Sequence, residues 1–332
     1  MNRVYIIVVN WNGWRDTVEC LDSLFFLTYS PFTVVVCDNG SHDDSVAQLK
    51  RWGEQRNIPC DEYRREDAES GGRKGAPSPL VLILNGANLG FAGGNNVGLR
   101  YALARGDFAY AWLLNNDTIV KDDSLTRLVE RMERQPEAGL CGSTIRYYHN
   151  PGQVQALGGG YYCRWIGLPW HYGRFTRQGE QIDQARAEWW MNYVEGASTL
   201  VSRAFLEEIG LMSEEYFLYF EEADWAMRAR GKFKLVYAPQ SIVYHKVGAS
   251  IGTSSNPARK SQLCDYFNIR NRLYFTLRYF PEALPTVYLG VICSLIVRMV
   301  LGRWDRAMMI LRLMRGYSDL DPDFLPACRD RS

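Results

Sequence analysis

The sequence predicts an α/β protein with a doubly wound, mostly parallel sheet, followed by a C-terminal helical segment. Short runs rich in Val, Ile and Leu alternate with stretches of helical character through the first half of the chain. Uninterrupted apolar runs of this kind are typical of parallel strands that helices cover on both faces. We expect strands over 4–9, 32–38, 80–84, 109–114 and 138–143 and helices over 14–28, 43–56, 94–105 and 122–134.

The second half of the chain is less regular. Residues 61–79 are charged, rich in Gly, Pro and Ser and without apolar period, which predicts a mobile surface loop. Residues 150–188 are rich in Gly, Tyr and Trp and favour loops and short antiparallel strands. Two further strands, over 192–202 and 234–245, should flank an acidic helix within 216–230.

Composition is that of an ordinary globular protein, with 332 residues, 47% hydrophobic and 23% charged. A formal charge of +1 gives no reason to expect a nucleic-acid partner. The eight cysteines form no CxxC pair and several lie in apolar runs, which favours a reduced, cytoplasmic setting over a disulfide scaffold. The first residues are too quickly polar for a signal peptide and are better explained as a buried strand.

Polar side chains follow the first two expected strands where each strand ends. Asn10 and Asn12 come after the first, and Asp38 and Asn39 after the second. Ligands of doubly wound sheets bind at the carboxyl ends of the strands, where Asp38 could accept hydrogen bonds from a ribose or a base. The alternative is an Asx turn that caps the helix starting near Asp43.

A glycine-rich segment, NLGFAGGNN, leads into the helix after the third strand. Its candidate ligand-binding residues are Asn88, Gly90, Gly93 and Asn95. Glycines let the backbone approach a phosphate or base closely, and a helix N-terminus favours an anion. The spacing differs from GxGxxG and the segment follows the wrong strand, so it does not predict a dehydrogenase.

The strand over 109–114 ends in three polar residues, Asn115, Asn116 and Asp117. Oxygen ligands at a sheet edge suit a hard cation such as Mg²⁺ or Mn²⁺ together with diphosphate oxygens. The alternative is ordinary turn chemistry. His245 ends a later strand and could return to the same edge, although a lone histidine is more often structural.

The acidic helix carries Glu214, Glu221, Glu222 and Asp224 beside an aromatic cluster. Positions three and four apart share a helix face, so these acids cannot all point to solvent. A carboxylate beside aromatic rings is partly desolvated, which raises its pKa and makes it a candidate proton acceptor. The alternative is a first turn whose acids complement the helix dipole.

Taken in order, these motifs resemble the family-2 glycosyltransferases with the A-type glycosyltransferase fold, in particular the rhamnosyltransferase-like branch. The resemblance covers about residues 3–250. It implies a nucleotide-diphospho-sugar donor, a Mg²⁺ or Mn²⁺ ion and inversion at the anomeric carbon. The segments that carry it are VVNWNG (8–13), CDNGSHD (37–43), NLGFAGGNNVG (88–98), LLNNDT (113–118), EGASTLVSR (195–203), YFLYFEEADWAMRARG (216–231) and IVYH (242–245).

The resemblance also implies roles for individual residues. Glu222 would be the catalytic base, flanked by Glu221 and Asp224, and Asp117, His245 and Asn115 would face the metal. Asn115 and Glu222 stand where the family usually has aspartate. The remaining roles are the nucleotide-sugar site, with Asn10, Asn12, Asp38, Asn39, Asn88, Gly90, Gly93, Asn95, Asn116 and Asp117, and the acceptor site, with Trp225, Tyr219, Glu195 and Gly196.

The function expected from this resemblance is transfer of one sugar, rhamnose by analogy with that branch, from a dTDP- or UDP-linked donor. The acceptor would be a hydroxyl of a glycan or lipid-linked glycan in cell-envelope polysaccharide biosynthesis. Two alternatives stay open. One is a sugar nucleotidyltransferase, although VVNWNG offers no triphosphate loop, and the other is a non-catalytic relative that binds nucleotide sugars.

The C-terminal segment has its own character. We expect a catalytic domain over 1–250 and a helical, basic segment over 251–332. Between Arg259 and Arg315 there are ten basic and three acidic residues, an excess of seven positive charges. The uncharged run Ala283–Val297 has fifteen residues, short of the roughly twenty that span a bilayer. We expect one or two helices at the inner membrane surface, and the alternative is a helical subdomain that packs on the catalytic core or forms a homodimer.

Overall fold

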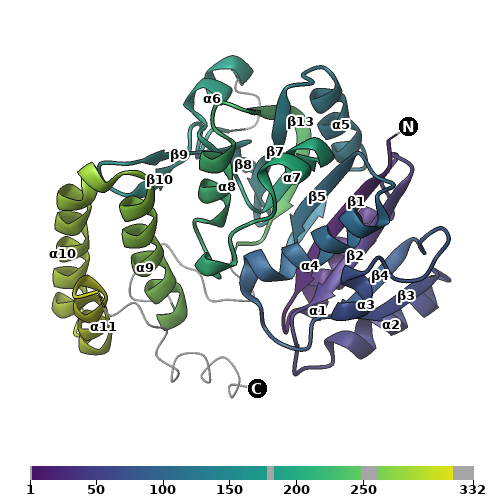
Figure 1. Ribbon diagram of the computed structural model, residues 1–332, viewed down its shortest axis with the longest axis horizontal. Coiled ribbons are helices and arrows are strands. Elements are labelled where there is room, and N and C mark those ends of the chain that lie inside the picture. Colours follow the sequence, from purple (N-terminus) through teal and green to yellow (C-terminus); the bar gives the residue numbers. More distant parts are fainter. Residues whose placement is uncertain (1, 178–182, 248–260, 317–332) are drawn as a thin grey trace. The chain divides into compact units, whose positions relative to one another are not determined.

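The computed structural model describes residues 2–177, 183–247 and 261–316, and these fall into two compact units (Figure 1). The first unit comprises Met1–Tyr161, His171–Phe217 and Glu221–Ser250. The second comprises Tyr162–Trp170, Leu218–Phe220 and Ile251–Ser332. Two short pieces of the middle of the chain therefore belong with the C-terminal residues, a division that no composition shift predicts.

The first unit is built on one large mixed sheet. Its strands lie in the order β8-β7-β12-β5-β1-β2-β4-β3, with β9 beside β8 and with β13 beside β7 and β6. The bounds are β1 (Val4–Asn10), β2 (Phe32–Asp38), β3 (Cys60–Arg64), β4 (Leu80–Leu84), β5 (Tyr110–Asn115), β6 (Thr118–Val120), β7 (Ala138–Tyr147), β8 (Asn150–Leu157), β9 (Gly159–Cys163), β11 (Tyr193–Val194), β12 (Ser198–Ser202) and β13 (Lys234–His245).

The pairs β1–β2, β1–β5, β2–β4 and β3–β4 are parallel, and β12 joins the sheet antiparallel to both β5 and β7. The predicted doubly wound, mostly parallel fold is thereby confirmed for the first half of the chain. Parallel pairing puts the ends of β1, β2 and β5 at one edge of the sheet. That edge carries most of the polar motifs.

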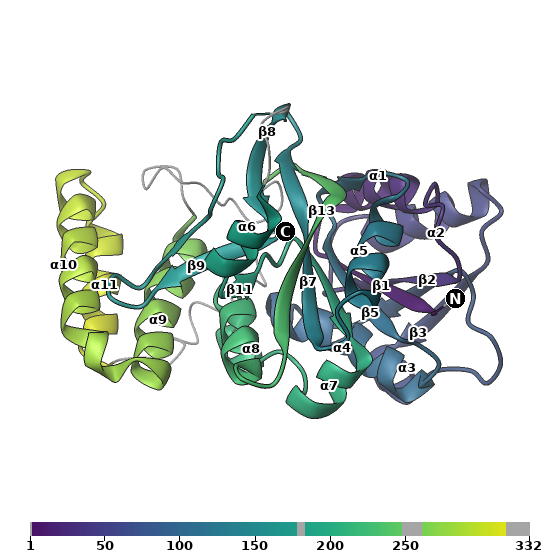
Figure 2. The same cartoon turned by 90° about the horizontal axis from the view of Figure 1, so that it is seen from above.

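Helices cover both faces of this sheet (Figure 2). One core contains Ile6 and Val8 of β1 with Leu21, and the other contains Tyr5 and Ile7 with Val97, as period-2 alternation requires. The helices of the first unit are α1 (Trp14–Leu24), α2 (Ser45–Gln55), α3 (Arg65–Glu69), α4 (Gly90–Arg105), α5 (Ser124–Glu133), α6 (Gln184–Trp190), α7 (Arg203–Ile209) and α8 (Glu221–Ala229), with a 3-10 turn at Glu214–Tyr216.

The expectation of a surface loop over 61–79 is wrong for its first half. β3 and α3 occupy these residues, and β3 pairs with β4 at the edge of the sheet. The reason is burial on one side only: Tyr63 is buried whereas Cys60 and Glu62 are exposed. An edge strand with a polar outer face resembles a loop in composition.

The second unit contains three α-helices within its described residues, whereas the sequence predicted one or two. They are α9 (Gln262–Tyr279), α10 (Leu284–Val300) and α11 (Trp304–Met314), and β10 (Leu168–Trp170) lies in the same unit. Asp265 of α9 is 1% exposed and pairs with Arg298 of α10 and Arg306 of α11, at 2.9 Å and 3.4 Å. Charged side chains thus form part of the interior of this unit.

Candidate active site

The ends of β1 and β2 are joined by a buried network around Asp38. Its carboxylate accepts hydrogen bonds from Asn10 Nδ2 at 2.8 Å, Ser41 Oγ at 2.6 Å and Ser41 N at 3.0 Å. Asn10 in turn accepts from the Thr17 hydroxyl at 2.8 Å. The bond from Ser41 N joins residues three apart and fixes Asp38 in place, but it lies before α2 and does not cap that helix.

Asn12 and Asn39 are used within this edge. Asn12 Oδ1 accepts from His42 N at 2.8 Å, which shapes the loop after β2. Asn39 is 2% exposed, donates to Gly90 O at 2.9 Å and accepts from Asn85 Nδ2 at 2.7 Å. Both ends of its amide are engaged in the interior, so the Asn39 side chain ties β2 to α4.

The glycine-rich segment has a different purpose from the one predicted. Gly90 has a φ of +73°, and a Cβ built there would overlap Phe217 O. A Cβ on Gly93 would lie 2.7 Å from the Leu89 side chain. The Asn95 amide, 1% exposed, donates to Phe91 O at 2.9 Å. Gly90 therefore lets Phe217 approach α4 closely, whereas the contacts of Gly93 and Asn95 lie within the α4 segment itself.

Asn88 and Asn116 also make local contacts. Asn88 Oδ1 accepts from Gly90 N at 2.9 Å and so shapes the start of α4. Asn116 Nδ2 donates to Thr17 Oγ1 at 3.0 Å and so faces α1. Both residues lie at the sheet edge, but these hydrogen bonds give each side-chain amide a partner within the protein, without a ligand.

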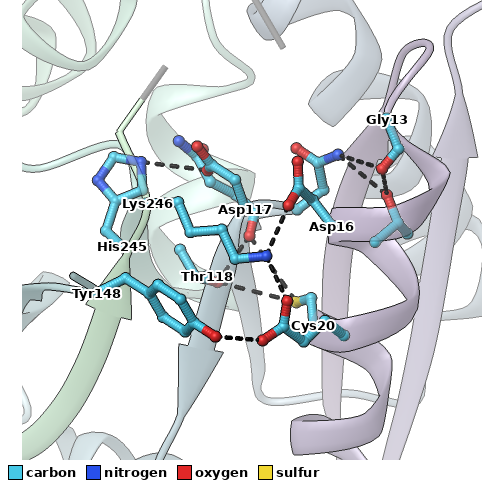
Figure 3. A network of polar contacts seen from close by, with 12 residues as sticks. Gly13, Asp16, Cys20, Asp117, Thr118, Tyr148, His245 and Lys246 are labelled. Carbon is cyan, nitrogen blue, oxygen red and sulfur yellow. Dashed lines mark hydrogen bonds and ion pairs between the residues drawn. The ribbon is translucent and has the colours of Figure 1, made fainter. Parts of the chain in front are cut away.

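Asp117 and His245 come together as predicted. β13 pairs with β6 so that His245 lies opposite Thr118, and Asp117 Oδ1 is 3.2 Å from His245 Nε2 (Figure 3). Both side chains are buried. Burial lowers the pKa of His245, but the neighbouring Asp117 carboxylate outweighs this effect and the pKa is raised above its ordinary value.

This pair fits a divalent metal. Two adjacent ligands of an octahedral ion with bonds of about 2.1 Å lie roughly 3 Å apart, close to the observed oxygen–nitrogen separation. Among the described residues, no group of three or more His, Cys, Asp or Glu side chains could hold a metal. A Mg²⁺-like ion commonly takes one or two protein ligands and completes its shell from water and substrate phosphates. Asn115, at the end of β5, lies two residues before Asp117.

The residues that hold this pair were not predicted from the sequence. On β8, the Gln155 side chain places its Oε1 3.0 Å from His245 Nδ1. Lys246 pairs with Asp16 at 2.6 Å and with Glu19, both on α1 (Figure 3). Its backbone N donates to Asp117 O at 3.0 Å. Strand periodicity of residues 150–157 was the one available signal for Gln155, and it is weak there.

Glu222 lies at the start of α8 against the turn between β11 and β12. A Cβ built on Gly196 of this turn would lie 2.2 Å from Glu222 Oε1, so the carboxylate packs directly on this glycine. Burial, then the charges of Glu221 and Glu195, raises the pKa of Glu222 well above its ordinary value. The predicted perturbation of this carboxylate is thus present, with burial as its main cause.

The same turn connects Glu222 to the metal edge. Ala197 O accepts from Asn115 N at 3.1 Å, and the Glu195 charge also raises the pKa of His245. Glu195 Oε2 lies 3.5 Å from His171 Nδ1, a contact that the sequence did not indicate. The segment Glu195–Ala197 therefore runs between the candidate base and the end of β5, as a shared site requires.

Two expectations about α8 need correction. Trp225 is 1% exposed, packs edge-on against Phe205 and donates to Gly210 O at 2.8 Å, so it belongs to the core and cannot stack on an acceptor. Asp224 is fully buried and bonds to Arg228 at 2.8 Å and Tyr216 at 3.3 Å. It fixes α8 internally, whereas the sequence predicted that it orients the base.

Tyr219, the remaining acceptor candidate, belongs to the second unit and has a φ of +69°. Glu221 is 2% exposed, and its charge contributes to the pKa of its neighbour Glu222.

Comparison with solved structures places the fold. A mannosyltransferase, PcManGT from Pyrobaculum calidifontis, in complex with GDP-Man and Mn²⁺, superimposes with a TM-score of 0.52 and 14% identity over 99% of this chain and 86% of its own. GalNAc-T7 with UDP, GalNAc and Mn²⁺ gives 0.55 and 14% identity over 82% of this chain and 50% of its own. At this identity the likeness concerns the fold, which is that of the A-type glycosyltransferases.

Sequence comparison gives two named relatives. The N-acetylglucosaminyl-diphospho-decaprenol L-rhamnosyltransferase of Mycobacterium tuberculosis is 24% identical over 261 residues, 74% of this chain and 77% of the relative. The low-salt glycan biosynthesis hexosyltransferase Agl10 of Haloferax volcanii is 25% identical over 230 residues, 69% of this chain and 62% of the relative.

The family model described as glycosyl transferase family 2 matches residues 5–210, more than half of the chain. The matched range contains the strand ends with Asp38 and Asp117, whereas Glu222 and His245 follow it. The family predicted from the motifs is confirmed: this chain belongs to glycosyltransferase family 2.

Proposed function

We propose that this enzyme transfers a single sugar, rhamnose, from a dTDP- or UDP-linked donor to a hydroxyl of a lipid-linked glycan, with inversion at the anomeric carbon. The named rhamnosyltransferase relative supports the sugar and the lipid-linked acceptor. The observation that carries the chemistry is the position of Glu222, a carboxylate of raised pKa packed on the turn whose Ala197 bonds to the end of β5.

The donor would lie along the edge formed by the ends of β1, β2 and β5. Asn10 and Asp38 would hold the nucleoside, since their hydrogen-bond network fixes both side chains before any ligand arrives. Asp117 and His245, 3.2 Å apart, would hold Mg²⁺ or Mn²⁺ together with diphosphate oxygens. When bound, such an ion neutralises negative charge on the departing nucleoside diphosphate.

Glu222 would act as the general base. Its carboxylate takes the proton of the acceptor hydroxyl as the hydroxyl oxygen forms a bond to the anomeric carbon and the bond to the diphosphate breaks. A raised pKa increases the affinity of Glu222 for this proton. A well-placed general base contributes about 10²–10⁴-fold to a rate.

Glu222→Gln tests this assignment. We expect sugar transfer to fall by at least about 10²-fold, whereas calorimetry with Mn²⁺ and the nucleotide sugar gives unchanged donor affinity. Glu208→Gln is the control, because Glu208 is an exposed glutamate paired with Lys232. Undiminished turnover by Glu222→Gln would overturn the base assignment. Thermal-shift screening against dTDP- and UDP-sugars identifies the donor. Stabilisation only by nucleotide sugars that do not carry rhamnose would overturn the choice of rhamnose.

The metal assignment has a separate test. Asp117→Ala should abolish Mn²⁺-dependent binding of the donor, because His245 alone is a weak site for a hard cation. Calorimetry with and without Mn²⁺ measures this difference. If the Asp117→Ala variant kept the full Mn²⁺ dependence of donor binding, the ion would have to be held elsewhere.

We further propose that the second unit holds this cytoplasmic enzyme on the inner membrane surface, where a lipid-linked acceptor would be found. The outward side of α10 has no charge from Leu284 to Val297, and Leu289 and Val300 are 62% and 81% exposed. The helical stretch Pro281–Val300 is long and apolar enough to cross a membrane by length and composition. Only 17% of its apolar stretch is buried inside the protein. This stretch is longer than the fifteen residues counted from the sequence alone.

A position on the bilayer surface agrees better with the contacts of α10 than a position across it. Val287, Val291 and Arg298 form its buried side, and Arg298 bonds to Asp265. Crossing the bilayer would carry this ion pair into hydrocarbon, which is costly. Trp165, Trp170 and Trp304 of the same unit are 46%, 68% and 60% exposed, and tryptophan is enriched at membrane interfaces.

The positive charge of the second unit supports binding to an anionic lipid surface. The described part of the second unit has nine arginines and three acidic residues, and arginine near a bilayer is attracted by anionic headgroups. Flotation of the purified protein with phosphatidylglycerol vesicles should recover it, whereas phosphatidylcholine vesicles should recover much less. Val300→Glu should abolish recovery, and Phe26→Glu, at an exposed residue of the first unit, should not. Vesicle binding that is insensitive to Val300→Glu, or a dimer that this change dissociates, would overturn the proposal.

A further inference from the structure

The turn that leads into α8 has an unusual backbone. Phe217, Tyr219 and Phe220 have φ values of +61°, +69° and +76°, although none is glycine. Such a conformation is costly for a residue other than glycine and persists only where the surroundings enforce it. α8 begins at Glu221, directly after this turn, so Glu222 is only two residues from the last strained position.

Asn271 of α9 holds the middle of the turn. Its amide nitrogen donates to Leu218 O at 2.8 Å and to Tyr219 O at 3.0 Å, which uses both of its N–H groups. The Asn271 side chain is fully buried. These three residues all belong to the second unit, so the bonds lie within one compact body.

Aromatic packing fixes the end of the turn in the same unit. The Phe220 ring lies edge-on to Tyr162, with centroids 5.7 Å apart, and 5.6 Å from Phe275 of α9. At the start of the turn, Phe217 O accepts a hydrogen bond from Phe91 N at 2.7 Å. Within Leu218–Tyr219, both carbonyls accept from the Asn271 amide, which supports the strained conformation at the middle of the turn.

We propose that Asn271 is a positioning residue for the catalytic base. By holding Leu218 O and Tyr219 O, it sets where α8 begins and hence where the Glu222 carboxylate lies relative to an acceptor hydroxyl. A misplacement of about 1 Å at a reacting group can cost on the order of 10²-fold in rate. This inference rests on the proposed role of Glu222. Asn271 would act on the base through the chain from Tyr219 to Glu222, without contact with substrate.

The sharpest test is Asn271→Asp. Aspartate has the same size, but its carboxylate cannot donate to the two carbonyls. Asn268→Asp is the matched control, since Asn268 is half-buried one turn earlier on the same helix. We expect kcat to fall roughly 10–100-fold in Asn271→Asp. The Kd for donor with Mn²⁺ should stay unchanged, and Asn268→Asp should behave as the native protein.

Hydrogen exchange gives a readout that does not depend on activity. Amides of residues 217–224 should exchange faster in Asn271→Asp than in Asn268→Asp, while those of β1, β2 and β5 should not change. If Asn271→Asp fails to fold, Asn271→Ser, which keeps one shorter donor, is measured in the same two ways. Its loss of kcat should then lie between those of the native protein and an inactive enzyme.

The outcomes separate this inference from the assignment of the base. Native kcat in a folded Asn271→Asp variant, with Glu222→Gln inactive, overturns the role of Asn271 and leaves the base in place. A parallel loss of kcat and donor affinity in Asn271→Asp, with faster exchange throughout, would show a general structural role and also overturn it. Activity in Glu222→Gln would overturn the base itself, whatever Asn271→Asp shows.

Discussion

The two compact units place carboxylates in opposite surroundings. In the second unit, Asp265 faces two arginines, Arg298 and Arg306, and is compensated on both sides. In the first unit, Glu222 faces the like charges of Glu221 and Glu195, and its pKa rises well above the ordinary value. The two units also differ in where their apolar side chains lie. The first unit buries them in its cores, whereas α10 of the second unit exposes them.

The difference separates a carboxylate placed for structure from one placed for chemistry. A buried carboxylate with paired arginines contributes to a specific packing of helices. A buried carboxylate beside other carboxylates opposes folding, and perturbed groups of this kind gather at functional sites. The first kind should therefore be costly to remove, and the second should stabilise the protein when it is removed.

The largest expected effect is on the second unit. Asp265→Leu leaves Arg298 and Arg306 buried without their shared partner, and removing one member of a buried ion pair costs about 3–5 kcal/mol. Hydrogen exchange of α9 and chemical unfolding measure this loss. Asp305→Asn is the control, because Asp305 contacts the same Arg306 but is itself 58% exposed. Surface pairs contribute about 0–1 kcal/mol. Equal losses in the two variants would remove the distinction between these sites.

Asp265 also shows where prediction from sequence ends. The strands β1, β2, β4 and β5 were predicted because continuous apolar runs carry their own signal, and Asp117 and His245 because each follows such a run. Asp265, in contrast, has its partners 33 and 41 residues away in sequence. Nothing local distinguishes it from a solvent-exposed acid on a basic helix, so its role follows only from how three helices pack.

The glycine-rich segment gives the complementary lesson. Its glycines predicted a ligand, and the structure instead packs Phe217 against Gly90. Glycine marks a close approach but not what approaches. Trp225 was misassigned for a similar reason, since an aromatic residue beside a catalytic helix has the same sequence signature in the core and in a sugar site. Burial decides between the two, and burial is a property of the folded chain.

A smaller effect is expected where Gln155 supports the metal edge. If Gln155 Oε1 accepts from Nδ1–H of His245, the Nε2 lone pair is left for the metal, and loss of such a partner typically costs 10–100-fold in metal affinity. Gln155→Leu should weaken Mn²⁺ binding by about this factor, measured by electron paramagnetic resonance. Gln155→Glu, which keeps the acceptor, should preserve it.

Two further measurements sharpen this prediction. Gln153→Leu changes a half-buried glutamine on the same strand and should leave Mn²⁺ affinity unchanged. With only four histidines in the chain, ¹⁵N resonances can report which ring nitrogen of His245 carries the proton. A mixture of tautomers in the native protein, or native Mn²⁺ affinity in Gln155→Leu, would show that Gln155 does not orient His245.

The smallest effect concerns Glu222, and its sign is opposite to that for Asp265. The pKa of Glu222 is raised above the ordinary value of 4.5, so between these two values the folded state holds a proton that the unfolded state releases. The free energy of unfolding therefore falls as pH rises through this window, and the loss is complete above the folded pKa. Each unit by which the pKa is raised corresponds to about 1.4 kcal/mol in the free energy of unfolding.

Glu222→Gln should thus unfold at the same temperature as the native protein near pH 4 and at a higher temperature at pH 8, measured without metal or donor. A difference that did not change with pH would mean that the strain at Glu222 comes from packing against Gly196, and the contrast with Asp265 would then be steric in origin.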